Sequence, residues 1–348
     1  MPDLIEPYAK KSLPNYEVVP LRNNEITVAA LQMTTKTVDA KNPKPILKEN
    51  LEHMLWLVDA AQRRGPVDLL CFPEFTLQGT AASVWTREEM LRIAIELPGE
   101  ETELIGKKAK QYNCYIVVSC YTKEKDWSGH FFNASFMIGP SGEVIQNHWK
   151  AHFDPGYLEH ATSVHDVLDE FVERYGWDAV WPVARTDIGN IAHYTCSEGF
   201  APETPRVFAF KGAEILVWCL TGGEGREEAH NIGQTYFQRN DVYGILIDAA
   251  LRPPSFYAWE TSGCGLSYIF DNAGRTLERA HLPHETVIRA TIPIAAFRKK
   301  HSIPVLRKEL YAPVYADYVG KYPPNMYSEY LPKDPLDGIN YARKKARW

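Results

Sequence analysis

Residues 193–217, HYTCSEGFAPETPRVFAFKGAEILV, decide the fold and the chemistry that we predict for this chain. An apolar run ending at Tyr194 leads to Cys196 in a Cys-Ser-Glu-Gly turn. A helix then begins at the Pro-Glu-Thr-Pro sequence and ends at Gly212, and a strand follows at 214–220. A cysteine between a strand and a helix lies near unpaired backbone N–H groups and the positive end of the helix dipole, which favour the thiolate. Cys196 is therefore a candidate nucleophile, although a cysteine taken alone is more often a buried structural residue.

The composition is that of a globular chain whose main partner is not a polyanion. Of the 348 residues, 45% are hydrophobic and 24% are charged, and the formal net charge is −6. These values argue against nucleic acid or an anionic membrane as the principal ligand. No run approaches the ~18 apolar residues that a membrane span needs, and the first residues lack a secretory apolar segment. The six cysteines form no CxxC pair, so we expect reduced thiols and a cytoplasmic protein.

Strand and helix patterns alternate along the chain and predict an α/β body. The predicted strands are 25–32, 68–73, 115–122, 131–142, 144–150, 188–194, 214–220, 243–250, 266–271 and 287–294; the predicted helices are 43–64, 87–112 with a break at Pro98-Gly99, 164–176, 202–212 and 227–240. We divide the chain into an N-terminal arm (1–24), a main domain (25–296) and an extended C-terminal tail (297–348). Proline and tyrosine dominate the tail and no helix or strand period persists in it, so we expect it to pack on the body or on a partner subunit.

Two charged residues follow predicted strands, as Cys196 does. Glu74 comes directly after the apolar run DLLCFP, where a rigid strand can aim a catalytic base into a pocket. Lys150 closes the strand VIQNHWK, where its ammonium can stabilise a developing negative charge. For either residue alone, a surface position at a strand end is the plainer interpretation. His148 and His152 are four residues apart, but no HExxH motif or Cys/His cluster accompanies them, so we expect no metal.

Taken together, these three residues resemble a known catalytic set. Glu74 in CFPEFTLQG, Lys150 in HWKAHFDPG and Cys196 in YTCSEGFAPETPR are similar to the Glu-Lys-Cys set of the nitrilase superfamily of carbon–nitrogen hydrolases. The segments FFNASFMIGPSGEVI, FAFKGAEILV and GLSYIFDNAGRTLERA extend the resemblance over roughly residues 26–294. The resemblance implies a four-layer α-β-β-α sandwich, a homodimer or higher homo-oligomer, and no cofactor. It also implies a second glutamate that helps to place the substrate, for which Glu159 is the best match.

The chain departs from the superfamily pattern at two places. The segment 161–184 is longer than is usual between the second glutamate and the cysteine strand, so the pocket rim does not follow by analogy. The residue after Cys196 is Ser197, where nitrilases typically have tryptophan. Cys-Ser-Glu-Gly, followed by Pro-Glu and KGAEILV, looks closer to the aliphatic amidase branch, which favours an amide over a nitrile as substrate.

From this resemblance we expect hydrolysis of a small-molecule amide to a carboxylic acid and ammonia. Glu74 would act as the base, Cys196 as the nucleophile, and Lys150 with the Ser197 backbone N–H would hold the oxyanion. Aromatic residues near the site, of which we single out Tyr157, Trp149 and Phe200, would bind the substrate. The alternatives are a nitrilase, an N-carbamoyl amino acid amidohydrolase, for which Arg206, Arg226 and Arg252 offer a carboxylate clamp, and a catalytically inactive binding or scaffold protein.

Overall fold

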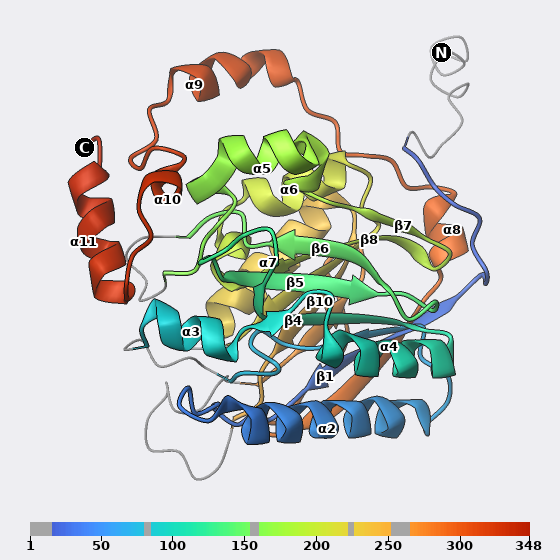
Figure 1. Cartoon of the computed structure of the whole chain (residues 1–348). Helices are drawn as coiled ribbons and strands as arrows, with labels where there is room; N and C mark the ends of the chain where they lie inside the picture. Colours follow the sequence, from blue (N-terminus) through green and yellow to red (C-terminus); the bar gives the residue numbers. More distant parts are fainter. Residues whose placement is uncertain (1–15, 80–84, 154–159, 222–225, 252–264) are drawn as a thin grey trace.

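The centre of the molecule consists of two mixed β-sheets stacked face to face (Figure 1). The computed structural model describes residues 16–79, 85–153, 160–221, 226–251 and 265–348. The first sheet contains, in spatial order, β13 (Thr286–Ile292), β1 (Ile26–Gln32), β2 (Leu69–Cys71), β4 (Tyr115–Lys123), β5 (Phe132–Ile138) and β6 (Val144–Trp149), with β3 (Ile95–Glu96) paired to β4. The second contains β12 (Thr276–Arg279), β11 (Tyr268–Phe270), β10 (Tyr243–Asp248), β9 (Ile215–Leu220), β8 (Gly189–Thr195) and β7 (Ala184–Thr186).

The two sheets pack through the apolar side chains of alternate strand residues. In β1, Val28 and Ala30 belong to the buried cluster that joins the two sheets, whereas Ala29 and Leu31 belong to a cluster with the outer helices. The second sheet contributes buried side chains such as Val217 to the same central cluster. This alternation follows from the two-residue period of a strand, and it explains why the strands that are covered on both faces are apolar along their whole length.

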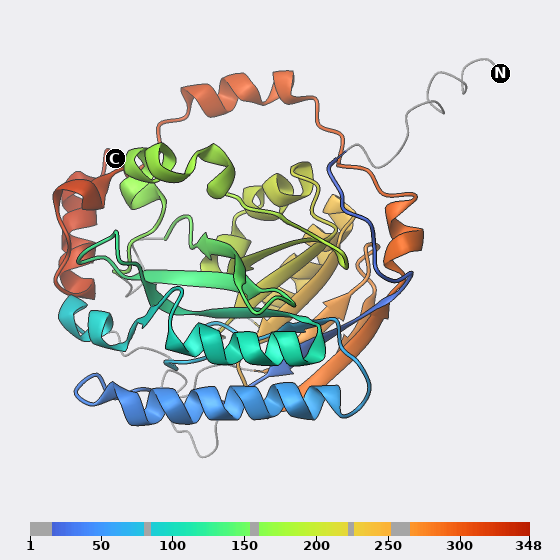
Figure 2. The same ribbon diagram turned by 45° about the vertical axis from the view of Figure 1, so that its right-hand side comes forward.

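Helices cover the outer face of each sheet (Figure 2). On the first sheet lie α2 (Pro43–Gln62) and α4 (Glu100–Tyr112), with α3 (Arg87–Ile93) beside them; on the second lie α6 (Glu203–Phe210) and α7 (Arg226–Asn240). The predicted four-layer α-β-β-α sandwich is therefore confirmed. No helix in the described ranges is both long enough and apolar enough to cross a membrane.

The C-terminal tail contains helices, so the prediction that it has no helical period is wrong. The helices that follow β13 are α8 (Ile294–Arg298), η5 (Lys308–Leu310), α9 (Ala312–Asp317), α10 (Met326–Glu329) and α11 (Pro335–Lys345). Met326 and Tyr327 of α10 are buried in one cluster with Phe171. The Arg87 Nε–H of α3 donates to the Pro332 carbonyl at 2.6 Å, and the Asn325 N–H donates to the His165 carbonyl at 2.9 Å. Helices α10 and α11 form because the body supplies a surface on which these short segments can bury apolar side chains, whereas η5 and α9 have no buried residue.

The long segment before β7 forms the surface on which the tail docks. It contains η2 (His165–Val167), α5 (Leu168–Tyr175) and η3 (Trp177–Ala179). Its apolar residues share a buried cluster with β5 and β6 residues and with α10. Segment 161–184 and the tail thus pack against each other and bury a shared apolar cluster at one side of the first sheet.

Candidate active site

Glu74, Lys150 and Cys196 follow strands whose carboxyl ends meet at one edge of the sandwich. Strands β2, β4 and β6 run in the same direction, because β2 is parallel to β4 and two antiparallel pairings separate β4 from β6. In the second sheet, β8, β9 and β10 are parallel. The Glu74 N–H donates to the carbonyl of Leu220 at the end of β9, at 3.2 Å. The carboxyl ends of both sheets therefore lie together, and the three predicted residues occupy this shared edge.

Glu74 forms a buried ion pair with Lys150. The two side chains are 1% and 3% exposed, and the Lys150 Nζ lies 3.4 Å from Glu74 Oε1. Asn133 of β5 bonds to both partners. Its side-chain Nδ2–H donates to Glu74 Oε1 at 2.7 Å, and its backbone carbonyl accepts the backbone N–H of Lys150 at 2.8 Å. The Lys150 ammonium also lies 5.0 Å from the centre of the Phe153 ring. With so little water around them, the acid and the ammonium interact more strongly than they would at the surface.

Cys196 begins the turn η4 (Cys196–Phe200) with an uncommon backbone conformation. Its φ is +47°, in the left-handed region that non-glycine residues rarely adopt and that is often found at functional sites. Trp218 Nε1–H donates to the Cys196 carbonyl at 2.9 Å. Gly199 lies against the same indole, where a Cβ would be 2.2 Å from Trp218 Cε2. Only glycine at position 199 lets this tight turn rest on Trp218.

Among the five described cysteines, Cys196 is the one that is partly exposed. Cys71, Cys114, Cys120 and Cys219 are fully buried, and burial raises the pKa of Cys114 to about 12 and raises the pKa values of the other three thiols as well. A buried thiol with a raised pKa is a poor nucleophile. Among the described cysteines, burial therefore argues against every candidate nucleophile except Cys196.

The carboxylate of Glu198, which sequence reasoning missed as a functional residue, joins the cysteine turn to the Lys150 strand. It is fully buried and accepts from the N–H of Thr195 at 3.0 Å, from the N–H of Ala151 at 2.7 Å, and from His148 Nε2 at 3.1 Å. Burial alone would raise the pKa of Glu198, but the charge and hydrogen bond of His148, the charge of His152 and the N–H of Ala151 hold this pKa below its usual value. The sequence carried one signal for this residue, the Thr-x-x-Glu pattern of a capping box.

Asn133 lies in the segment FFNASFMIGPSGEVI, which supports the family resemblance, but the sequence assigned it no role of its own. The structure buries it completely in β5, in contact with both Glu74 and Lys150. The two-residue period of a strand predicts which face of β5 carries Asn133. Its contact with Glu74 depends in addition on the order of β2, β4 and β5 in the sheet, which the period does not predict.

Trp149 lies in the core and not beside Lys150. Trp149 is only 3% exposed. Its ring stacks on Phe132 with centroids 3.6 Å apart, and its Nε1–H donates to Glu124 at 2.7 Å. Neighbouring residues of a strand face opposite sides, so Trp149 and Lys150 point apart. The packing therefore does not support the predicted substrate-binding role for Trp149.

The remaining predicted residues divide into two groups. Ser197 is partly exposed beside Cys196, and Phe200 is 36% exposed at the end of η4 with its ring edge-on to Trp218. Glu159, Tyr157 and Arg252 lie outside the described residues, as does the side chain of Arg226. No group of three or more His, Cys, Asp or Glu residues in the described ranges is arranged to hold a metal ion.

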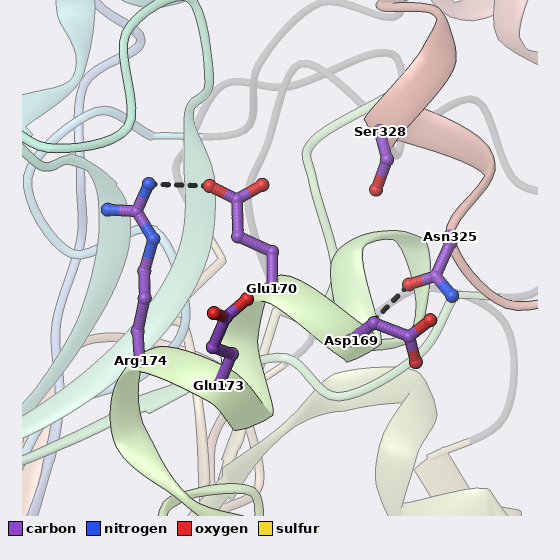
Figure 3. Close-up of a pocket in the computed structure, with 6 residues that line it drawn as sticks. All are labelled: Asp169, Glu170, Glu173, Arg174, Asn325 and Ser328. Carbon is purple, nitrogen blue, oxygen red and sulfur yellow. Dashed lines mark hydrogen bonds and ion pairs between the residues drawn. The ribbon is translucent and has the colours of Figure 1, made fainter.

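A surface hollow between α5 and α10 is lined by none of these catalytic candidates (Figure 3). The Glu170 carboxylate pairs with Arg174 one helical turn further along α5, and the Asn325 side-chain oxygen accepts the Asp169 N–H at 2.9 Å. The other lining residues are Glu173 and Ser328. These contacts join the tail to α5, and we assign the hollow to that junction and not to catalysis.

Comparison with known proteins finds relatives in sequence and in fold. The sequence profile of the carbon-nitrogen hydrolase family matches residues 27–300. A formamidase of Helicobacter acinonychis is 27% identical over 269 residues, which are 73% of this chain and 70% of that protein. A formamidase of Bacillus cereus is 31% identical over 234 residues, which are 65% of this chain and 62% of that protein. The fold is similar to that of Saccharomyces cerevisiae Nit3, a member of branch 10 of the nitrilase superfamily, with a TM-score of 0.65, 18% identity, and 81% of this chain and 96% of Nit3 covered.

Proposed function

Because the chain belongs to the carbon-nitrogen hydrolase family, we propose that it hydrolyses a small-molecule amide to a carboxylic acid and ammonia through a thioester on Cys196. The observation that carries this proposal is the buried Glu74–Lys150 pair, with 3.4 Å between Nζ and Oε1, at the strand edge where the partly exposed Cys196 follows β8. The similarity to formamidases supports an amide over a nitrile, and it places formamide first among the substrates to test.

The proposed reaction begins with proton transfer from Cys196 to Glu74. The sulfur attacks the amide carbonyl, and the Lys150 ammonium and the Ser197 N–H stabilise the oxyanion, each such donor being worth about 3 kcal/mol of the barrier. Glu74 then protonates the leaving nitrogen, so the C–N bond breaks and ammonia departs. Water, deprotonated by Glu74, cleaves the thioester and releases the acid. Glu159 would hydrogen-bond the substrate nitrogen, and Tyr157 and Phe200 would line the pocket.

Ammonia release from a panel of substrates tests this proposal. The panel contains formamide, acetamide, longer and aromatic amides, nitriles matched to these amides, and N-carbamoyl amino acids. An amidase releases ammonia from an amide faster than from the matched nitrile, whereas a carbamoylase also releases carbon dioxide. The variant C196A should lose turnover, and C114A, which removes a buried thiol, should retain it. Equal activity of C196A and the wild type would refute the proposal.

The function also suggests where the protein works. We propose a cytoplasmic location, because the mechanism requires a reduced thiol and a reducing compartment maintains it. The buried thiols of Cys71, Cys114, Cys120 and Cys219, none of them in a disulfide, are compatible with such a compartment. Fractionation of the native cells with an antibody to the protein tests this; recovery only from the secreted fraction would contradict it.

We further propose that two copies of the chain associate through the arm 305–319, which carries α9. Leu310 and Val314 are each 70% exposed, and Tyr318 is 64% exposed. In both overall views α9 lies at the rim of the molecule between two extended segments (Figures 1 and 2). Apolar surface of this kind is typical of an interface. Residues 310–319 contain a single charged residue, Asp317, so two such arms can meet with little charge repulsion.

Light scattering after size-exclusion chromatography measures this association. The wild type should elute as a dimer or larger species, and L310E/V314E should shift it toward the monomer. The control L282E changes another exposed leucine, which is 63% exposed but lies outside the arm, and should leave the oligomer unchanged. A wild-type protein that is monomeric at micromolar concentration would rule out the arm as an interface.

A further inference from the structure

We propose that Glu198, fixed by His148, is a positioning residue that sets the distance between the Cys196 sulfur and the Lys150 ammonium. This inference rests on the proposed function, because it concerns the geometry of the same two groups. Glu198 does not belong to the set of residues that the reaction itself requires. It is fully buried, and it acts through the backbone of its neighbours.

The bonds of Glu198 reach the backbone on both sides of the site. The Thr195 N–H, one residue before Cys196, donates to Oε2 at 3.0 Å. The Ala151 N–H, one residue after Lys150, donates to Oε1 at 2.7 Å. One carboxylate thus joins a residue adjacent to the nucleophile with a residue adjacent to the lysine, although β8 and β6 belong to different sheets.

His148 fixes the orientation of this carboxylate. Its Nε2 lies 3.1 Å and 3.2 Å from the two oxygens of Glu198, and both side chains are inaccessible to solvent. The ring of His148 packs against the rings of Trp181 and Phe208, with centroids 5.8 Å and 5.7 Å away. Because His148 is two residues before Lys150 in the β6 sequence, its packing connects the carboxylate to the strand that ends at the lysine.

Two side-chain pairs that join β4 and β5 to β8 also cross between the sheets, but neither reaches the backbone of a catalytic segment. Ser119 Oγ lies 3.4 Å from Thr195 Oγ1, and Ser135 Oγ lies 2.7 Å from His193 Nδ1. These pairs align β4 and β5 with β8. Glu198 differs from them because it accepts two backbone N–H groups, each adjacent to a catalytic residue, so moving its carboxylate moves both.

The substitutions that test this role separate charge, hydrogen bonding and packing. E198Q keeps the size of the side chain but replaces one acceptor oxygen with an NH₂ group, which must then face a backbone N–H that also donates. H148Q keeps an N–H donor, whereas H148F removes it while filling the space. R298M is the matched control: it breaks another buried carboxylate pair, in which Arg298 Nη2 lies 2.6 Å from Glu214 Oε2.

Two measurements on the full-length protein read the geometry of the site independently. The first is kcat and KM for ammonia release. The second is the rate at which iodoacetamide alkylates Cys196, followed by mass spectrometry of the peptide that contains it, which requires no turnover. Because a misplacement of about 1 Å can reduce catalysis about 10²-fold, we expect E198Q and H148F to lower kcat by at least about 30-fold with little change in KM. We expect alkylation of Cys196 to slow in both variants, since a displaced Lys150 stabilises the thiolate less.

The conservative and control variants complete the test. H148Q should recover most of the activity that H148F loses, and R298M should lower the thermal midpoint while the folded enzyme keeps its kcat and its alkylation rate. If E198Q does not fold, H148F decides. Wild-type kcat and alkylation rate in a folded E198Q or H148F protein would overturn the positioning role. If the wild type hydrolyses no amide, the proposed function fails, and the alkylation rates still decide the role of Glu198.

Discussion

Two carboxylates, Glu74 and Glu214, are both buried beside a cation, and we propose different tasks for them. The Glu74 side chain is 1% exposed and the Glu214 side chain is inaccessible, and each faces a cation. Glu214 accepts two short bonds from Arg298, 2.8 Å from Nε and 2.6 Å from Nη2, and further bonds from the Tyr16 hydroxyl and the Asn190 N–H. The distance between Glu74 Oε1 and Lys150 Nζ is longer, at 3.4 Å.

The two carboxylates lie toward opposite ends of β9. Glu214 directly precedes β9, whereas the backbone N–H of Glu74 donates to the carbonyl of Leu220, at the carboxyl end of β9. At the amino end, the planar guanidinium of Arg298 fixes the N-terminal arm and α8 to the body through a rigid two-bond pair. At the carboxyl end, the ammonium of Lys150 is a point charge on a flexible stem, which can serve a substrate oxygen as well as a carboxylate. Under the proposed function, the choice and geometry of the cation, more than burial, separate the structural carboxylate of Glu214 from the reactive carboxylate of Glu74.

The same substitution in both carboxylates should give opposite results, and this is the largest effect that we expect. E74Q keeps an acceptor for Asn133 but removes the base, so kcat should fall about 10³-fold. E214Q should leave the kcat of the folded enzyme within about twofold of the wild type, because position 214 is remote from the chemistry. The rate of ammonia release per folded molecule, with circular dichroism to measure the folded fraction, checks both. Comparable losses in the two variants would remove the distinction.

Breaking the structural pair should cost stability. R298M leaves the Glu214 carboxylate buried without its cation, and such a loss typically costs 3–5 kcal/mol. We expect about 3 kcal/mol, the lower end of this range, because Tyr16 and Asn190 still donate to Glu214. Urea unfolding of wild type and variant measures the difference. A change of less than about 0.5 kcal/mol, the size of an ordinary surface substitution, would show that the pair is not structural.

A third buried carboxylate, that of Asp166, sharpens the comparison through pH. Burial raises the pKa of Asp166 to about 6, and the bonds from Ser163 only partly oppose this. Because the folded protein binds this proton more tightly than the unfolded chain does, protonated Asp166 stabilises the native state at pH values below the unfolded-state pKa of about 4. This contribution to the free energy of unfolding is lost as the pH rises through the folded-state pKa of about 6. D166N should therefore be more stable than the wild type at pH 8, on the order of 1–3 kcal/mol, with a smaller difference at pH 4.

Thermal unfolding between pH 4 and pH 8 measures this dependence. The control D178N changes an exposed carboxylate whose pKa Lys211 lowers, so its effect should have the opposite sign and be small. If the difference between D166N and the wild type does not change with pH, the native protein does not hold a proton on Asp166.

The sequence predicted what depends on local periodicity. The strands near 25–32 and 115–122 and the helices 43–64 and 227–240 agree with β1, β4, α2 and α7 to within a few residues. The stacking of the two sheets came from resemblance, since strand order is not a local property. The candidate site was predicted from three residues that each follow a predicted strand. Because these strands run in the same direction within each sheet, their carboxyl ends lie at one edge.

What the sequence did not predict depends on distant parts of the chain. The proposed positioning role of Glu198 depends on its contacts with Ala151 and His148, some 50 residues earlier in the chain. The spacing of residues in the sequence does not predict such distant contacts. The helix α10 has four residues and is stable only because the body buries Met326 and Tyr327. For α11 a signal was present: Asp334 caps the helix, Pro335 is its first residue, and the last turn is basic.

The central claim is that the Cys196 sulfur carries the acyl group of an amide substrate during turnover. Acid quenching of the wild type during hydrolysis of its best amide, followed by mass spectrometry of the peptide containing Cys196, tests this claim most directly. The account predicts a peptide heavier by the acyl group, absent from C196A and released by hydroxylamine as the hydroxamate. Rapid ammonia release by C196A, or steady turnover with the acyl group on another residue, would contradict it.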